Sequence, residues 1–349
     1  MSEEWIRSSM RGATLYYNPK INAFRMDNNA NLLGPNPVAS RVLKELAETD
    51  VNFYPTTYSD PLREALAEFY GLETDNFVAG NGSDEMLDVC FKTLLQCGEK
   101  VVIPYPTYAL HSFFVKVNAG KIIQVDLKEG FQLDPDEINS TDGKIVLLCT
   151  PNNPTANAFR SKDIKEIVEG RDRPIIVDEA YGEFIKDSFI PLVNDCANLI
   201  VTRTFSKAYG LAGMRVGYAV SNKSLAQTLL RAKTPLSLNL LSERVAIAAL
   251  KDREYVRKTV QMVEKNRGLL SEGLRTLGFD VFPSDANFVL ARSPIPSEKL
   301  VSDLAKKGIL IRDFGRLRML ENCVRITIGT AEMSARLLTK LAEVLGECR

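Results

Sequence analysis

Seven short apolar runs, rich in β-branched residues, recur through the first two thirds of this chain, and segments with a helical pattern separate them. The runs are residues 77–79, 100–103, 121–125, 145–149, 174–177, 199–202 and 216–220. Because they lack a clean alternation of apolar and polar residues, they are typical of strands that are buried on both faces. The alternation of strands and helices predicts an α/β fold, with a mostly parallel sheet flanked by helices.

Two of the intervening segments have a recognisable helix start. Residues 83–96 begin with Ser83 as a predicted N-cap, carry acidic residues in the first turn, and end near Gly98. Residues 161–169 also begin with a serine. We therefore predict helices over both ranges.

The pattern changes after about residue 222. A long helical region reaches about residue 277 with a break near Pro235, and a last helix is predicted over 331–345. Between them lie predicted strands at 287–290, 309–311 and 324–328, with a helix between the first two. With 349 residues the chain is longer than chains that usually fold around a single hydrophobic core. We expect a large domain over 38–235 and a smaller α+β domain formed by 1–37 and 236–349.

The charge and hydropathy patterns exclude several classes of function. The chain has 44 basic and 44 acidic side chains, so it lacks the basic excess of proteins that bind nucleic acid or a membrane surface. No apolar run approaches the roughly 20 residues that span a bilayer. The N-terminal residues lack the pattern of a secretory signal. We expect a cytoplasmic protein without nucleic-acid or membrane partners.

The cysteines and the single histidine argue against a metal site. None of the six cysteines forms a Cys-x-x-Cys pair, and His111 is the one histidine, so we predict no metal and reduced thiols. A hydrolase with a Ser-His or Cys-His pair would need His111 as its base. A single histidine therefore gives little support for a hydrolase. We expect His111 to contribute ordinary packing from a helix that follows Pro106.

A lysine with nearby hydroxyls carries the strongest chemical signal. Lys207 follows Thr204 and Ser206, and a turn of small residues then leads to Arg215. An aldehyde cofactor that carries a phosphate needs such a set, because the amine can form a Schiff base while the hydroxyls and the guanidinium hold the phosphate.

A carboxylate ends one of the predicted strands. Asp178 closes the run 175–178, which places it at the carboxyl edge of a parallel sheet, where ligands bind. There it could pair with a protonated pyridine nitrogen, while Tyr181 could bind an oxygen on the ring. On their own, a helix cap and a core side chain explain these two residues more simply.

Three further loops follow predicted strands. In Gly-Asn-Gly-Ser-Asp-Glu, the N–H groups of Ser83 and Asp84 would stand at a helix start, where anions bind. Tyr108 could stack on a pyridine ring. Asn153 lies in a loop fixed by prolines and could donate to a ring oxygen. A tight turn or a rigid loop would explain each of these segments alone.

The order of these segments resembles a known family. Gly-Ser-Asp-Glu, Pro-Thr-Tyr, Pro-Asn-Asn-Pro-Thr, Asp-Glu-Ala-Tyr and Thr-Phe-Ser-Lys follow successive predicted strands. Over nearly its whole length the chain resembles the class-II aminotransferases of the fold-type I superfamily that uses pyridoxal 5'-phosphate (PLP), and among them the histidinol-phosphate aminotransferases. The resemblance implies PLP as cofactor and a homodimer with shared sites.

The resemblance also implies a role for each site residue. Lys207 would bond to PLP and move the proton, Asp178 would pair with the pyridinium, and Tyr181 would act beside them as the third catalytic residue. Tyr181 and Asn153 would hold the ring hydroxyl oxygen, and Tyr108 would stack on the ring. The implied phosphate ligands are Ser83, Asp84, Thr204, Ser206, Arg215 and, from the neighbouring subunit, Tyr54.

The implied substrate residues are Arg325, in Cys-Val-Arg-Ile-Thr-Ile-Gly-Thr, together with Arg312 and Asn31. A guanidinium suits the bidentate capture of a carboxylate or phosphate. Without the resemblance, both arginines are most simply solvated charges at strand ends. We interpret Arg316 and Arg318 as surface residues.

Three positions depart from the family pattern. Ala30 and Leu32 stand where the family segment Asn-Glu-Asn-Pro has its Glu and Pro. Ala156 replaces the usual glycine after Pro-Thr, which suggests that this position does not require a positive φ. The family tyrosine that touches substrate corresponds to Tyr16 or Tyr17.

The resemblance implies transfer of an amino group from L-histidinol phosphate to 2-oxoglutarate, which gives imidazole acetol phosphate and glutamate in histidine biosynthesis. Three alternatives remain open. One is an aminotransferase for an aromatic or other amino acid, and a second is an O-phosphothreonine decarboxylase. The third, outside the enzymes, is a PLP-binding regulator, which the missing basic excess disfavours.

Overall fold

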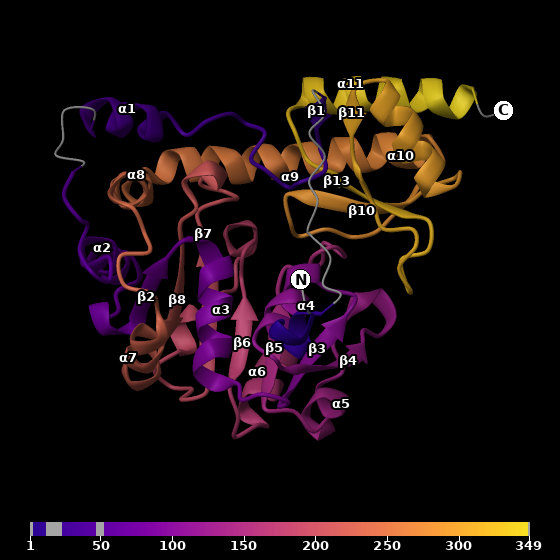
Figure 1. Cartoon of the computed structure of the whole chain (residues 1–349). Helices are drawn as coiled ribbons and strands as arrows, with labels where there is room; N and C mark the ends of the chain where they lie inside the picture. The colour runs from indigo at the N-terminus through magenta and orange to yellow at the C-terminus, as the bar shows by residue number, and fades with distance from the viewer. Residues whose placement is uncertain (1–2, 12–22, 47–51, 348–349) are drawn as a thin grey trace.

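A seven-stranded sheet forms the centre of the computed structural model, which describes residues 3–11, 23–46 and 52–347 (Figure 1). The strand order is β2-β8-β7-β6-β5-β3-β4. Its strands are β2 (Phe77–Gly80), β3 (Lys100–Tyr105), β4 (Lys121–Asp126), β5 (Ile145–Cys149), β6 (Ile175–Asp178), β7 (Leu199–Thr204) and β8 (Gly217–Ser221). Neighbouring strands are parallel except that β8 is antiparallel to both β2 and β7, which confirms the predicted mostly parallel sheet.

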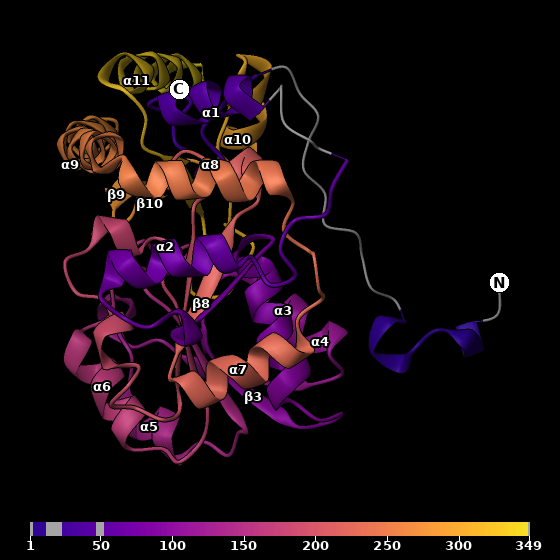
Figure 2. The same ribbon diagram turned by 90° about the vertical axis from the view of Figure 1, so that its left-hand side faces the viewer.

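Helices cover both faces of this sheet (Figure 2). On one face lie α3 (Gly82–Leu94), α4 (Ala109–Val117) and α7 (Lys223–Ala232). On the other lie α2 (Asp60–Tyr70), α5 (Pro135–Ser140) and α6 (Ser161–Glu169), and α8 (Leu240–Lys251) with α1 (Pro37–Leu46) extends that layer. Successive strand residues point to opposite faces, so Val78 packs under α3 while Phe77 and Ala79 pack with the other layer.

A second, antiparallel sheet forms a smaller unit beside the first. Its order is β12 (Arg312–Asp313), β13 (Cys323–Thr327), β10 (Phe288–Arg292) and β9 (Asp280–Val281). A two-stranded parallel pair, β1 (Phe24–Arg25) with β11 (Ile309–Leu310), lies next to it. The helices α9 (Arg253–Thr276), α10 (Ser297–Lys306) and α11 (Ala331–Gly346) complete the unit, and α9 extends from it towards the large sheet (Figure 1).

The remaining helical elements are short 3₁₀ turns. They are η1 (Glu3–Trp5), η2 (Ser8–Met10), η3 (Thr74–Asn76), η4 (Glu129–Phe131), η5 (Gly182–Phe184), η6 (Ile190–Leu192) and η7 (Ala212–Met214). Among the described residues, no helix combines the length and the apolar character that crossing a bilayer requires.

The predicted domain limits stay a prediction. Strand β1, near the N-terminus, pairs with β11 of the smaller unit. However, α8 lies beyond the predicted boundary at residue 235, and its Val245, Ala246 and Ala249 belong to the apolar cluster under the large sheet.

Two local predictions are wrong. Helix α3 begins at Gly82 with Asn81 in the N-cap position, so Ser83 lies within the first turn and is not the cap. Alanine in place of the usual glycine led us to predict that position 156 does not need a positive φ. Ala156 nevertheless has a φ of 72°, in the left-handed region. Ala156 lies in a tight loop, in which the Ala156 N–H donates to the Asn152 carbonyl and the Asn152 N–H donates to the Asn157 carbonyl (both 2.8 Å). The candidates Tyr16 and Tyr17 lie outside the described residues.

Candidate active site

The carboxyl ends of the central parallel strands meet the smaller sheet at a cavity of about 280 Å³. Parallel strands that end at one edge bring residues from distant parts of the sequence together there. Of the predicted site residues, the following line this cavity: Ser83, Asp84, Tyr108, Asn153, Asp178, Tyr181, Thr204, Ser206, Lys207, Arg215, Arg312 and Arg325. Asn31 and Tyr54 do not line it.

Lys207 follows β7, and its amine is far less basic than that of a solvated lysine. Burial is the main cause, the positive charges of Arg325 and Arg215 add to it, and together they lower the pKa of Lys207 to about 8. Its Nζ lies 5.5 Å from the centre of the Tyr181 ring. The lowered pKa increases the neutral fraction of the amine, which is the form that a nucleophile or a base requires.

Two glycines let the backbone form one wall of the cavity. A Cβ on Gly217 would lie 2.2 Å from the backbone nitrogen of Ser83, so β8 reaches the start of α3 only without a side chain. Gly82 has a φ of +88°, and a Cβ there would lie 2.9 Å from the guanidinium of Arg215. Ser83 and Asp84, in the first turn of α3, line the cavity, and the N-terminus of a helix favours a bound anion.

Polar side chains surround the same wall. The Arg215 guanidinium donates to the Asp84 carboxylate (3.0 Å) and to the Ser206 hydroxyl (3.4 Å). The Thr204 hydroxyl donates to Ser206 (3.0 Å). Burial raises the pKa of the Asp84 carboxyl, and the neighbouring Arg215 guanidinium opposes that shift. The hydroxyls, the guanidinium and the helix start together form a phosphate-sized anion site.

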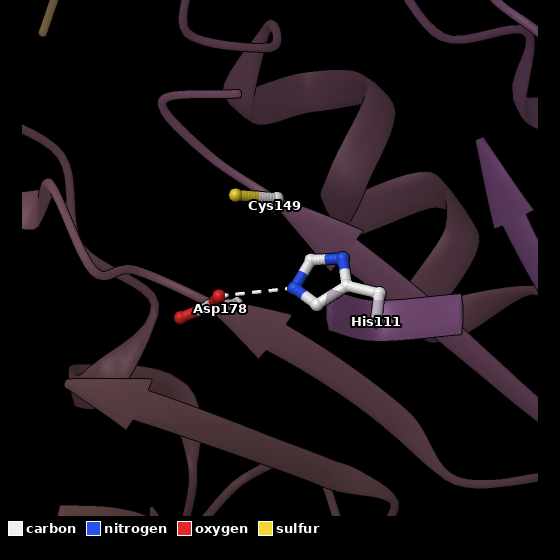
Figure 3. Close-up of side chains that lie close together, drawn as sticks. All are labelled: His111, Cys149 and Asp178. Carbon is white, nitrogen blue, oxygen red and sulfur yellow. Dashed lines mark hydrogen bonds and ion pairs between the residues drawn. The ribbon is translucent and has the colours of Figure 1, made fainter. Parts of the chain in front are cut away.

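Asp178 ends β6 and is held in place by Thr202 and by His111, and Figure 3 shows the contact with His111. Its Oδ1 accepts from the Thr202 hydroxyl (3.0 Å), and its Oδ2 contacts Nε2 of His111 (3.1 Å). His111 lies on α4, is fully buried, and meets the Tyr108 ring edge-on at 5.3 Å between ring centres. The expectation of ordinary packing for His111 misses this contact, because 67 residues separate it from Asp178.

A metal is a poor occupant of this cluster. Ligand atoms of His111, Cys149 and Asp178 lie within 4.8 Å of one another. However, burial and the neighbouring Asp178 raise the pKa of the Cys149 thiol well above its ordinary value, which disfavours the thiolate that a metal needs.

Asn29 is a site residue that the sequence analysis missed. Its amide donates to the Tyr181 hydroxyl (2.9 Å), and its Oδ1 accepts from the Thr327 hydroxyl (3.4 Å). Burial raises the pKa of the Tyr181 phenol, which therefore stays protonated in this structure. Asn29 has a φ of 57°, a conformation that asparagine tolerates better than most residues. An asparagine at this position was therefore a signal that the sequence analysis could have used.

The structure places Asn31 behind the cavity wall. Its amide donates to the carbonyl of Ala208 and to the hydroxyl of Thr259 (both 3.1 Å). Asn31 thus supports the backbone next to Lys207. Neither of these two bonds supports the substrate contact that was predicted for Asn31. Asn29, two residues earlier, reaches the cavity instead.

Two arginines face each other across neighbouring strands. Arg312 on β12 and Arg325 on β13 are direct partners in the antiparallel register, so their side chains lie on the same face. Like charges directly opposite each other are unfavourable unless an anion lies between them. Both residues line the cavity, which makes this pair its second anion site.

Arg325 is held from several sides. Its guanidinium donates to Oδ1 of Asn153 and to the backbone carbonyl of Asp27 (2.7 Å). It lies between the rings of Phe288 and Phe314, 5.3 Å from each ring centre. Because Oδ1 of Asn153 accepts from Arg325, the amide NH₂ of Asn153 remains available to donate to a ligand.

Asp27 is a second cavity residue that the sequence analysis missed. Arg25 holds its carboxylate through two bonds of 2.6 and 2.8 Å. Tyr54, in contrast, is 86% exposed and lies away from the cavity of its own chain. Its role in a neighbouring subunit's site stays a prediction.

Residues 21–345 match the sequence profile of aminotransferase class I and II. The chain belongs to the aminotransferase class I and II family. This membership confirms the predicted family and the predicted class of enzyme. It is consistent with a cavity that sets a lysine of low basicity between two anion sites.

Curated aminotransferases from other organisms are similar over most of this chain. The histidinol-phosphate aminotransferase of Methanosarcina mazei is 36% identical over 344 residues, which is 96% of this chain and 92% of that protein. That of Pyrococcus furiosus is 38% identical over 320 residues, 90% of each protein.

A solved aminotransferase has the same fold. The crystal structure of histidinol-phosphate aminotransferase from Sinorhizobium meliloti in complex with pyridoxal-5'-phosphate superposes with a TM-score of 0.91, at 24% identity and with 98% of each chain covered. At this identity the likeness shows the fold, and it confirms the predicted fold class.

Proposed function

We propose that this aminotransferase uses PLP to convert L-histidinol phosphate and 2-oxoglutarate into imidazole acetol phosphate and L-glutamate. One observation carries the proposal: a single cavity contains Lys207, a phosphate-sized anion site, and the facing pair Arg312 and Arg325. The names of relatives that are 36% and 38% identical support the choice of amino donor.

The residues of the cavity suit PLP. The wall at the start of α3, with Ser206, Thr204 and Arg215, would hold the phosphate, and Tyr108 would lie against the ring. Asp178 offers a buried carboxylate whose described partners, Thr202 and His111, leave it able to pair with a ring nitrogen. When bound, PLP supplies the electron sink that makes the proton beside the substrate amine acidic.

The side chains of this protein perform the proton transfer. Nζ of Lys207 accepts the proton from the substrate carbon and later returns it, a role that its pKa of about 8 favours because an efficient base has a pKa near the working pH. Asp178 keeps the proton on the ring nitrogen. The hydroxyl of Tyr181 and the amide of Asn153 orient the ring through its oxygen.

The facing arginines would bind both substrates. In one half-reaction they accept the phosphate of the donor, and in the other a carboxylate of 2-oxoglutarate. A guanidinium forms paired hydrogen bonds with either anion, so the same two residues can serve in both.

We further propose a homodimer with shared sites, located in the cytoplasm. The support for the dimer is that Phe53 and Tyr54, next to each other in the sequence, are 65% and 86% exposed. Large aromatic side chains so far out of the core are typical of an interface. Tyr54 would then reach the phosphate of the neighbouring subunit's PLP.

A half-reaction screen tests the proposed donor. The PLP form is mixed in turn with L-histidinol phosphate, O-phosphothreonine, phenylalanine and glutamate, and conversion of the cofactor absorbance is followed. We expect histidinol phosphate to have the highest ratio of limiting rate to apparent dissociation constant. Glutamate should also convert the PLP form, because this is the reverse of the half-reaction with 2-oxoglutarate.

Other outcomes identify the alternatives. Fast conversion by phenylalanine alone indicates an aromatic aminotransferase, and release of carbon dioxide from phosphothreonine indicates a decarboxylase. PLP binding without conversion by any amine contradicts the proposal and indicates a regulator.

A further inference from the structure

The segment 314–322, which we name the clasp, joins the two strands that carry the facing arginines. It leaves β12 just after Arg312 and Asp313 and enters β13 two residues before Arg325. Its ends are tied together, because the Phe314 N–H donates to the Cys323 carbonyl (2.9 Å). Its first residue, Phe314, lines the cavity and packs against the Arg325 guanidinium. The position of the clasp therefore determines where the anion site lies.

The tip of the clasp reaches the large sheet through Arg318. Its guanidinium forms a two-bond ion pair with the Asp126 carboxylate, with 2.7 Å between Nη2 and Oδ1, and it lies 4.5 Å from the centre of the Tyr105 ring. Tyr105 ends β3, Asp126 ends β4, and the two are register partners. The ion pair lowers the pKa of Asp126 and raises that of Arg318, so both stay charged.

Apolar contacts accompany the ion pair. Met319 packs against the core cluster of the large sheet. Leu320 is fully buried in a small cluster to which the large unit contributes Phe131 and the smaller unit contributes Phe282 and Phe314. The clasp thus contacts the large unit through both charge and packing.

We propose that Arg318 and Asp126 are positioning residues, which fix the clasp and, through Phe314, hold the guanidinium of Arg325 in place for the anionic group of the substrate. This inference deepens the proposed function and rests on it for the identity of that anion. Arg318 itself does not line the cavity, so its effect is on substrate binding and not on proton transfer.

The expected effect is modest, because both charged groups are about half exposed, at 51% and 48%. Exposed ion pairs contribute little to stability, but two-bond geometry and a ring beneath the guanidinium make this one more specific than most. Arg318→Ala should therefore leave the fold intact while it loosens the clasp.

Hydrogen exchange of the holoenzyme tests the structural part without reference to any substrate. In Arg318→Ala we expect faster exchange of the Phe314 amide, which donates to the Cys323 carbonyl, and of the Cys323 amide, which donates to the Leu320 carbonyl. The matched control is Arg316→Ala, two residues away, whose side chain pairs with Glu298 on α10 within the smaller unit. Equal exchange in both variants and the wild type would overturn the proposal.

Half-reaction kinetics test the functional part, with L-histidinol phosphate and L-glutamate as separate donors. For Arg318→Ala we expect the apparent dissociation constant to rise roughly two- to fivefold, with the limiting rate nearly unchanged and with Arg316→Ala like the wild type. A lower limiting rate at unchanged affinity contradicts a positioning role.

A double-mutant cycle decides whether the two residues act together. Asp126→Ala should weaken donor binding as Arg318→Ala does, and the double variant should be no weaker than either single variant. If the losses of donor binding in the two single variants add up in the double variant, the ion pair does not contribute to donor binding. If the wild type converts neither donor, the proposed function fails, and the exchange measurement alone decides the role of the clasp.

Discussion

At the scale of single residues, the site depends on a lysine that the protein makes less basic. Burial and the guanidiniums of Arg325 and Arg215 lower the pKa of Lys207, while Asp84 and Asp178 oppose them less strongly. The cationic side chains that are proposed to bind substrate and phosphate thus also favour the neutral form of the Lys207 amine.

We predict that capture of PLP by the cofactor-free protein rises with pH and levels off above about 8, because only the neutral amine of Lys207 attacks an aldehyde. Capture is measured at each pH by borohydride reduction and by the mass of the peptide that contains Lys207. Arg325→Gln should move the midpoint upward, since Arg325 is one cause of the lowered pKa. A midpoint near the ordinary 10.5 would refute the assignment.

Residue types together with the family resemblance predicted most of the residues that line the cavity, but not the contacts behind it. Lys207 follows a predicted strand, Asp178 ends one and Arg215 precedes the run 216–220. Because β8 is antiparallel to β7, its start lies at the edge where β6 and β7 end, which brings the three residues together. The bond from His111 to Asp178 and the bond from Asn29 to Tyr181 join residues 67 and 152 positions apart. No local pattern in the sequence records such pairs, because they arise only when the layers pack.

At the scale of elements, the central strands were predictable because β-branched runs between helical patterns leave few alternatives. The run 309–311 was predicted as one strand. In the structure β11 covers only its first two residues and pairs with β1, while β12, which pairs with β13, lies beyond the predicted run. The two-residue strands β1 and β9 were missed, since they are too short to show any periodicity.

The contact between β8 and α3 leads to a second prediction. Gly217→Ala places a Cβ 2.2 Å from the backbone of Ser83, so the phosphate wall must move. We expect about tenfold weaker PLP binding and a loss of about 1–3 kcal/mol in the free energy of unfolding. Gly213→Ala is the matched control, because a Cβ there meets nothing within 4 Å. Fluorescence titration with PLP and urea unfolding measure the two effects, and equal behaviour of both variants would contradict the prediction.

At the scale of the whole molecule, the proposed dimer predicts complementation between two inactive variants. Lys207→Ala lacks the amine, and Tyr54→Ala lacks the phosphate contact across the interface. A mixed dimer has one site with both residues intact, so remixed subunits should recover about a quarter of the wild-type activity. Activity is measured after the two variants are unfolded together and refolded. Activity that stays at the sum of the separate variants would contradict shared sites.

The hydrogen bond between Asn29 and Thr327 joins residues that are 298 positions apart. During synthesis, Asn29 leaves the ribosome 298 residues before Thr327, so this bond, which fixes the residue that contacts the Tyr181 phenol, forms only after Thr327 has emerged. Strand β1 likewise cannot pair until β11 has been synthesised. The large sheet can form first, but a working catalytic centre can arise only as one of the last events of folding.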